Sequence, residues 1–402
     1  MTHDAAAALI QAYYGTAPQH SYFVGCSDGG REGLMMAKRF PTYFDGIVAG
    51  AAAKSVTHLW ITNVRWEQLF SNAANVIPVS KIATIQNAST AACANPASGL
   101  VENPLQCNWD PSSLLCTGAD ATNCLTASQV AAVKTIMKGT FNPRTGKMIF
   151  PGYNMFSGLS GYIVTSPPLA GGQSGANALG AMAYQNTNWD WQNFNFDSDV
   201  DKIEATPIGA AVVLPEDLAA YKARGGKVLL YHGWEDPGIS PYDTVNFYER
   251  MIRVNATAAD GRVLDLSYQN PEFPYNQNTA NSSLSPRAQA LAAQAMKGAY
   301  ARSLATTEQF ARLYMVPGVN HCSGGPGPQS FTDATRQYGE LVQALETWVE
   351  NGVAPETIVV SKHAGDVSTA AVLFTHPLCT YPKVATYVGS GSTTSANNWV
   401  CK

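Results

Sequence analysis

The chain has 402 residues, of which 46% are hydrophobic and 13% charged, so it is long enough for one large domain or two ordinary ones. Its net charge of −4 provides neither a basic field for nucleic acid nor a polybasic anchor for a membrane surface. No apolar run approaches the ~18 residues needed to cross a bilayer. Composition therefore excludes nucleic-acid-binding and integral membrane classes.

The first fifty residues predict a helix and then a βαβ unit. Residues 5–14 form an Ala-rich run that stops at Gly15, which is typical of a helix with a glycine cap. An apolar strand is predicted over 21–25, followed by a Gly-rich turn, a helix over 31–40 and a second strand over 46–50. This order indicates an α/β fold with a parallel sheet.

Between about residues 54 and 206 the composition shifts to Asn, Ser, Gly and Pro, with five of the eight tryptophans and four of the eight cysteines. This change predicts an inserted, disulfide-stapled lid domain. We therefore divide the chain into a first core segment at 1–53, a lid at 54–206 and a second core segment at 207–402.

The α/β pattern resumes after the lid. Strands are predicted over 227–231 and 312–316, with a helix beginning near Asp243 and an amphipathic helix over 337–351. The four candidate strands are few for a sheet of this class.

The eight cysteines indicate an oxidising compartment. None lies in a CxxC pair, which argues against a zinc or thioredoxin-like site, and an even set at loop-like spacings favours disulfides. Buried free thiols remain the alternative. The N-terminal residues do not show the cationic and apolar pattern of a signal peptide.

Residues 25–29, Gly-Cys-Ser-Asp-Gly, are the one GxSxG motif in the chain. A predicted strand runs into the motif and a helix leaves it, as a nucleophile elbow requires. Ser27 is then the candidate nucleophile, and the Asp28 amide at the helix N-terminus is a candidate oxyanion donor. The alternative is a Gly-rich turn without chemistry.

A serine nucleophile needs a base and an orienting carboxylate, in the chain order Ser, acid, His for this fold. Asp236 and His321 follow two predicted strands, where open α/β sheets place their sites. Among the rivals, Asp243 is expected to cap its helix, Glu235 to be solvated and His232 to be a structural hydrogen-bond partner.

Cys26 adjoins Ser27, and Cys322 adjoins His321. If these cysteines are bonded, their Cα atoms lie within ~7 Å of each other, and the serine and histidine turns are held side by side. Independent buried thiols are the alternative.

At these residues the chain resembles the tannase and feruloyl esterase family, which includes the hydrolase of mono(2-hydroxyethyl) terephthalate. The resemblance rests on the segments around the elbow, the acid, the histidine and the C-terminal tail: 22–35, 40–50, 231–236, 316–325, 348–355 and 377–382. It implies an α/β-hydrolase fold with Ser27, Asp236 and His321 as the triad. It also implies four disulfides: Cys26–Cys322, Cys93–Cys107, Cys116–Cys124 and Cys379–Cys401.

The chain departs from the family pattern in three places. The family has a long segment before the elbow, so we expect an N-terminally truncated chain that lacks the first strands of the sheet. The family's calcium-binding loop matches residues 93–104, where Glu102 is the one carboxylate, so we expect no calcium or other cofactor. Asp236 and His321 are 85 residues apart (321 − 236), with an insert at about 255–310 whose role the resemblance does not supply.

These features predict a secreted or periplasmic serine esterase that cleaves feruloyl, galloyl or related phenolic esters through an acyl-enzyme. Its expected partner is a small aromatic ester, not a nucleic acid or a membrane, and the sequence specifies no oligomeric state. The lid tryptophans Trp60, Trp66, Trp189 and Trp191 either stack on substrate rings or fill a lid core. The alternative functions are a mono(2-hydroxyethyl) terephthalate-type hydrolase and an inactive, truncated phenolic-binding remnant.

Overall fold

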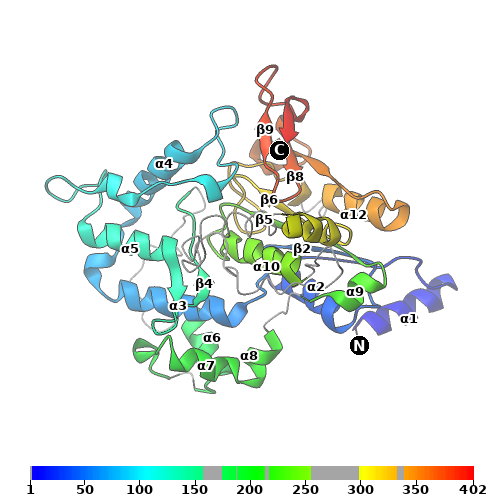
Figure 1. Ribbon diagram of the computed structural model, residues 1–402, viewed down its shortest axis with the longest axis horizontal. Coiled ribbons are helices and arrows are strands. Elements are labelled where there is room, and N and C mark those ends of the chain that lie inside the picture. The colour runs from blue at the N-terminus through cyan, green and yellow to red at the C-terminus, as the bar shows by residue number, and fades with distance from the viewer. Residues whose placement is uncertain (1, 157–173, 187, 213–216, 255–297, 333–338) are drawn as a thin grey trace.

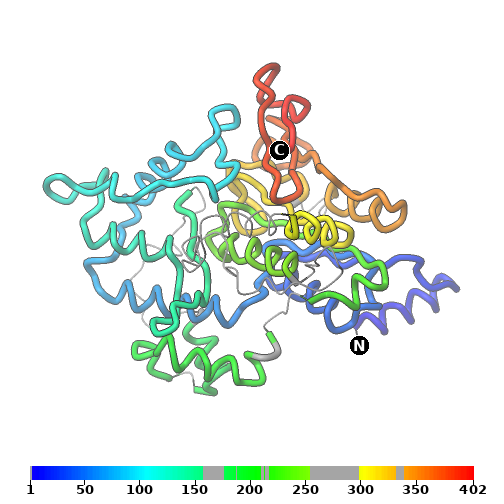
Figure 2. Tube along the Cα trace, viewed as in Figure 1, coloured from blue at the N-terminus to red at the C-terminus, as the bar shows by residue number. Residues whose placement is uncertain are grey.

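The structure is a computed structural model that describes residues 2–156, 174–186, 188–212, 217–254, 298–332 and 339–402 (Figures 1 and 2). Its helices are α1 (Thr2–Tyr14), α2 (Asp28–Arg39), α3 (Val56–Phe70), α4 (Ile82–Cys93), α5 (Ala127–Lys138), α6 (Ser174–Met182), α7 (Ser198–Glu204), α8 (Pro207–Val212), α9 (Ala219–Ala223), α10 (Pro241–Val254) and α12 (Gly339–Asn351). Its strands are β1 (Tyr22–Cys26), β2 (Gly46–Gly50), β3 (Gly139–Phe141), β4 (Met148–Pro151), β5 (Lys227–Gly233), β6 (Ala311–Val316), β7 (Thr357–His363), β8 (Val372–Cys379), β9 (Ala385–Tyr387) and β10 (Trp399–Cys401).

Four parallel strands form the central sheet in the order β1-β2-β5-β6. Their register aligns the carboxyl ends, with Cys26 opposite Gly50, Gly50 opposite Tyr231, and Gly233 opposite Val316. The loops that follow β1, β5 and β6 therefore leave the same edge of the sheet. These loops carry Ser27, Asp236 and His321.

Side chains on β2, β5 and β6 alternate between two buried layers, as a parallel sheet covered on both faces requires. One face contributes Ile47, Val228, Leu230 and Leu313 to a core with α2, α9 and α10. The other face is covered by α12 and the antiparallel β7–β8 pair. β1, at the edge of the described sheet, is half-buried. The α/β class predicted from the sequence is confirmed.

The lid lies to one side of the sheet and contains α3 to α7 and the β3–β4 hairpin (Figure 1). It has two apolar cores that share α3. Phe70, at the end of α3, packs with α4 and α5, whereas Ile61 and Val64 pack with α6 and α7. Ile239, from the loop after β5, belongs to the first of these cores, so the lid packs on the loop that carries Asp236. The expected domain boundaries stay predictions.

The predicted elements are present, with shifted ends. α2 begins at Asp28 rather than residue 31 because the elbow turns directly into the helix. Asp243 does not cap α10, since that helix begins two residues earlier and the Asp243 carboxylate binds Lys54 at 2.7 Å. Gln337 and most of the insert at 255–310 lie outside the described residues. No helix in the described ranges is long and apolar enough to cross a membrane.

Gly25 is required by close packing of the elbow. A Cβ atom there would stand 2.5 Å from the Gly29 carbonyl carbon, whereas a Cβ at Gly29 would meet nothing within 4 Å. The first and last glycines of the motif therefore differ in their tolerance of a methyl group.

We expect Gly25→Ala to lower the free energy of unfolding by about 1–3 kcal/mol, since the added methyl overlaps rigid backbone. Gly29→Ala is the matched control, and we expect it to be neutral or to stabilise by up to about 1 kcal/mol because alanine favours helix. Denaturant titration of both variants measures the difference. Equal stability of the two would contradict this account of the elbow.

Candidate active site

Ser27 lies between β1 and α2 in a backbone conformation that L-residues rarely adopt, with φ 64° and ψ −122°. The turn is fixed from both sides, because the Ser27 amide donates to the Gly50 carbonyl at 3.0 Å and the Ala53 amide donates to the Ser27 carbonyl at 3.1 Å. Such a strained strand-to-helix turn presents the hydroxyl at the edge of the sheet. Asp28 is the first residue of α2, where backbone amides have no partner within the helix.

Asp236 is buried in the loop after β5, and both of its carboxylate oxygens are hydrogen-bonded. Oδ1 accepts from the amides of Gly238 at 2.7 Å and Ile239 at 2.9 Å. Oδ2 contacts His321 Nδ1 at 2.7 Å and His232 Nε2 at 2.9 Å. Burial by itself would raise the Asp236 pKa, but the two histidines outweigh burial and lower the pKa to about 2. Asp236 is therefore an anion near neutral pH.

His321 follows β6, and its side chain is one-third exposed (33%). Burial lowers its pKa, but the hydrogen bond and negative charge of Asp236, and then the charge of Asp28, raise the pKa above its ordinary value. Because Nδ1 is bound to the carboxylate, Nε2 remains for proton exchange.

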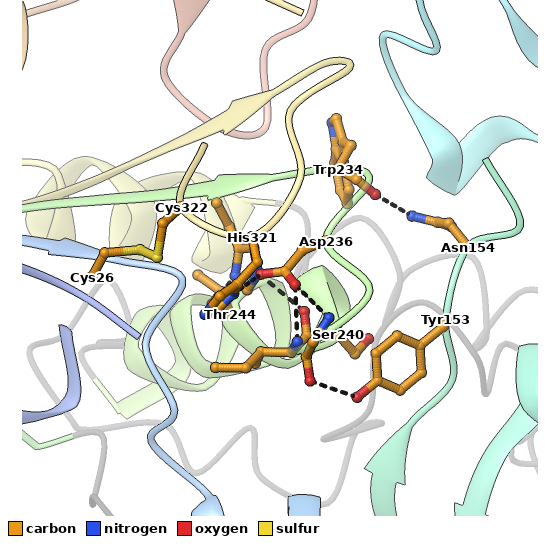
Figure 3. Close-up of polar contacts among 12 residues, drawn as sticks. Cys26, Tyr153, Asn154, Trp234, Asp236, Ser240, Thr244, His321 and Cys322 are labelled. Carbon is orange, nitrogen blue, oxygen red and sulfur yellow. Dashed lines mark hydrogen bonds and ion pairs between the residues drawn. A yellow bond between two sulfur atoms is a disulfide. The ribbon is translucent and has the colours of Figure 1, made fainter. Parts of the chain in front are cut away.

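A disulfide joins Cys26 to Cys322, with their Cα atoms 5.9 Å apart (Figure 3). It links the residue before Ser27 to the residue after His321, across 296 positions of sequence. Cys322 also has a positive φ of 60°, so both turns have unusual backbone at the junction. The structure thus brings together the three residues predicted as the triad, while their catalytic roles stay predictions.

The other cysteines form Cys93–Cys107, Cys116–Cys124 and Cys379–Cys401. All four pairs are those that the family resemblance implies, and free thiols, the alternative from composition, are absent because all eight cysteines are bonded. The first two pairs staple loops of the lid, and the last joins β8 to β10. An oxidising compartment fits this complete pairing.

His232 has a closer relation to the site than the sequence predicts. Its imidazole is fully buried, and Nε2 meets the same Asp236 oxygen that binds His321. In the sequence, the one indication of this contact is that His232 and Asp236 are four residues apart. That spacing brings the two side chains together only because the chain turns after β5. Glu235, expected to be solvated, is buried.

The lid segment after β4 is hydrogen-bonded to the acid loop at three successive residues, and Figure 3 shows the contacts of Tyr153 and Asn154. Ser240 Oγ donates to the Gly152 carbonyl, Tyr153 Oη donates to the Gly238 carbonyl at 3.3 Å, and Asn154 Nδ2 donates to the Trp234 carbonyl at 2.7 Å. This segment places the Tyr153 ring beside the loop that carries Asp236. Lid position and acid position are therefore coupled.

The four lid tryptophans do not share one environment. Trp60, Trp189 and Trp191 pack against the core around α6 and α7. Trp66 stands edge-on to the Tyr153 ring, with ring centroids 5.4 Å apart. Trp66 also packs against the other lid core, formed with α4 and α5. All four therefore pack against a lid core, and Trp66 is the one that also contacts the lid segment next to the acid loop.

The loop that matches the family's calcium site has a donor set that does not fit this ion. Glu102 is buried and bound to His376 Nε2 at 3.1 Å. The side-chain oxygens of Asn95 and Asn103 accept hydrogen bonds from Ala97 and Leu105 amides. Calcium prefers six to eight oxygens with several carboxylates. No step of the chemistry is assigned to a metal, and the expected lack of calcium stays a prediction.

We expect that removing the Cys26–Cys322 bond with a Cys26→Ala/Cys322→Ala double variant lowers turnover on the order of 100-fold, because small misplacements of reacting groups are costly. Stability should fall by at most about 6 kcal/mol in the chain-entropy model, for a sequence separation of 296. Cys379→Ala/Cys401→Ala is the control, with a loss of at most about 3 kcal/mol and turnover per folded molecule retained. Ester hydrolysis measures turnover, and thermal melting measures stability. Equal turnover by the two double variants would contradict a catalytic effect of the Cys26–Cys322 bond.

We also expect EGTA and added millimolar calcium to leave the melting temperature within about a degree of the untreated protein. The reason is that the loop offers one carboxylate and that carboxylate is bound to His376. Differential scanning fluorimetry measures the effect. A drop of several degrees in EGTA, reversed by calcium, would show that the loop binds the ion.

Three comparisons place the chain among known proteins. The family model described as tannase and feruloyl esterase matches residues 1–402. An uncharacterized esterase of Xanthomonas campestris pv. campestris is 35% identical over 98% of this chain and 67% of its own length. The mono(2-hydroxyethyl) terephthalate hydrolase of Piscinibacter sakaiensis is 30% identical over 99% of this chain and 66% of its length.

The solved structure of feruloyl esterase B from Aspergillus oryzae has a TM-score of 0.77 and 25% identity, covering all of this chain and 72% of that one. The chain thus spans about two thirds of the length of the curated relatives that it matches. With the family model matched from the first residue to the last, the chain belongs to the tannase and feruloyl esterase family of carboxylic ester hydrolases.

Proposed function

We propose that the protein is a serine esterase in which Ser27 attacks the ester carbonyl and forms an acyl-enzyme. The observation that carries the proposal is the Asp236–His321 contact of 2.7 Å beside the disulfide that holds His321 next to the serine elbow. His321 Nδ1 is committed to Asp236, so Nε2 takes the serine proton and passes it to the leaving alcohol. A water molecule activated by the same nitrogen then releases the acid.

The oxyanion of each tetrahedral intermediate is proposed to lie at the Asp28 amide. This amide is the first of α2, and the positive end of the helix favours the negative charge. Ser27 has the positive φ of a nucleophile elbow, a turn in which the amide after the nucleophile takes part in the oxyanion hole. Ser27 thus supplies the nucleophile, and the amide of the next residue, Asp28, stabilises the negative charge that the attack creates.

The proposed substrate is a small aromatic ester, of the feruloyl or galloyl kind. Relatives named for feruloyl esterase and for mono(2-hydroxyethyl) terephthalate hydrolase support aromatic acyl groups. Tyr153, beside the acid loop and in contact with Trp66, is itself buried in a lid core, so it supports the position of the lid next to Asp236 rather than a contact with substrate. The four disulfides support a secreted or periplasmic location.

The lid arginines favour a neutral phenolic ester over a substrate with a free carboxylate. The lid range 54–206 contains Arg65 and Arg144 only. Arg144 binds the Asp197 carboxylate with both Nε and a terminal nitrogen, and the Arg65 guanidinium lies over the Phe196 ring. Because both arginines are bound to other lid residues, neither supports a role in binding a substrate carboxylate. We therefore propose terephthalate monoesters as the second choice, after neutral phenolic esters.

We expect Ser27→Ala to lower the hydrolysis of p-nitrophenyl acetate and methyl ferulate on the order of 10³-fold or more, since the acyl-enzyme cannot form. Ser113→Ala, at an exposed lid position, is the control with unchanged rates. Spectrophotometric assay of methyl ferulate, methyl gallate and mono(2-hydroxyethyl) terephthalate ranks the substrates. Binding of ferulate without turnover by the folded wild-type chain would instead support a phenolic-binding remnant.

A further inference from the structure

We propose that His232, held by Thr244, is a positioning residue that shares Asp236 with His321 and thereby sets the pH at which His321 becomes a base. The inference rests on the proposed function, because it concerns the same acid and base. It assigns a task to a second, fully buried imidazole that does not face the nucleophile.

The hydrogen bonds around His232 fix where its proton sits. Nε2 faces Asp236 Oδ2 at 2.9 Å and the Ile239 carbonyl at 3.1 Å, and both of these atoms are acceptors. Nε2 therefore carries a hydrogen and donates. Nδ1 lies 2.7 Å from the buried Thr244 hydroxyl, which can donate to it. Thr244 thus locks the imidazole in the form that donates to the acid.

Asp236 Oδ2 is shared between two imidazoles, and this sharing has a chemical consequence. Each donor that stabilises the carboxylate charge makes the oxygen less basic and weakens its pull on the other donor. Oδ1 is already held by the Gly238 and Ile239 amides, so His232 acts on the oxygen that orients His321. Without His232 the carboxylate would bind protonated His321 more strongly. Activity would then be lost at a higher pH on acidification.

Several charged groups face this network from the elements around it. Asp28, on α2, acts on His321 and raises its pKa. Asp243, next to Thr244 on α10, is bound to Lys54 from the segment after β2, with nitrogen and oxygen 2.7 Å apart and both side chains buried. Glu235 is buried beside Asp236. The variants below leave each of these groups in place, so they change only the donor to Asp236.

The test compares Thr244→Val, which removes the hydroxyl at nearly constant volume, with Thr244→Ser, which keeps it. We expect Thr244→Val to lower kcat several-fold at neutral pH with KM unchanged. The acid limb of the kcat/KM profile should move upward by about half a pH unit or more. Thr244→Ser should restore the wild-type profile. His232→Leu should give the larger shift, and His232→Gln, whose amide nitrogen can reach the Nε2 position, a partial rescue.

An NMR titration of the His321 Cε1–H signal, assigned by its loss in His321→Gln, reports the same pKa without turnover. An upward shift in Thr244→Val that Thr244→Ser does not share supports the positioning role, even if the wild type cleaves no ester and the proposed function fails. An unchanged His321 titration in folded Thr244→Val and His232→Leu overturns it. A rise in KM at unchanged kcat would likewise overturn it. Should His232→Leu fail to fold, the comparison of Thr244→Val with Thr244→Ser still tests the proposal, because valine and threonine have nearly the same volume.

Discussion

The structure depends on one covalent constraint, the disulfide between Cys26 and Cys322, which joins two turns at the carboxyl edge of the sheet. Strand register already brings the ends of β1, β5 and β6 to one edge. Register alone leaves the following loops free to diverge, because loops carry few of the packing contacts that fix strands. The bond removes that freedom at the residues next to Ser27 and His321. Geometry at the site is thereby tied to the redox state of the compartment.

Asp236 is the second centre of organisation. It is a buried anion with four donors, two from backbone amides and two from imidazoles. A buried carboxylate is tolerated only when its charge is compensated in this way, since an unpaired one would cost several kcal/mol. The same compensation fixes the direction of both oxygens. Stability of the loop and orientation of His321 therefore have one physical origin.

The lid is part of this arrangement and not a separate cover. Its segment 152–154 hydrogen-bonds to the acid loop at three positions, and Ile239 of that loop packs in a lid core. These contacts couple the position of the lid to the loop that holds the acid. Substitutions in the lid can therefore change kcat as well as substrate preference.

The sequence by itself determined the four strands of the central sheet, the elbow and the order of serine, acid and histidine, because local apolar runs, glycine placement and chain position encode backbone geometry directly. The β3–β4 hairpin and strands β7 to β10 were found only in the structure. It also supplied the adjacency of cysteines to serine and histidine. Only the tertiary structure decided that His232 shares Asp236, that Asp243 binds Lys54 and that the four lid tryptophans pack against lid cores. These outcomes depend on which side chains meet across loops and layers. That choice follows from sheet order and packing, which no local pattern records.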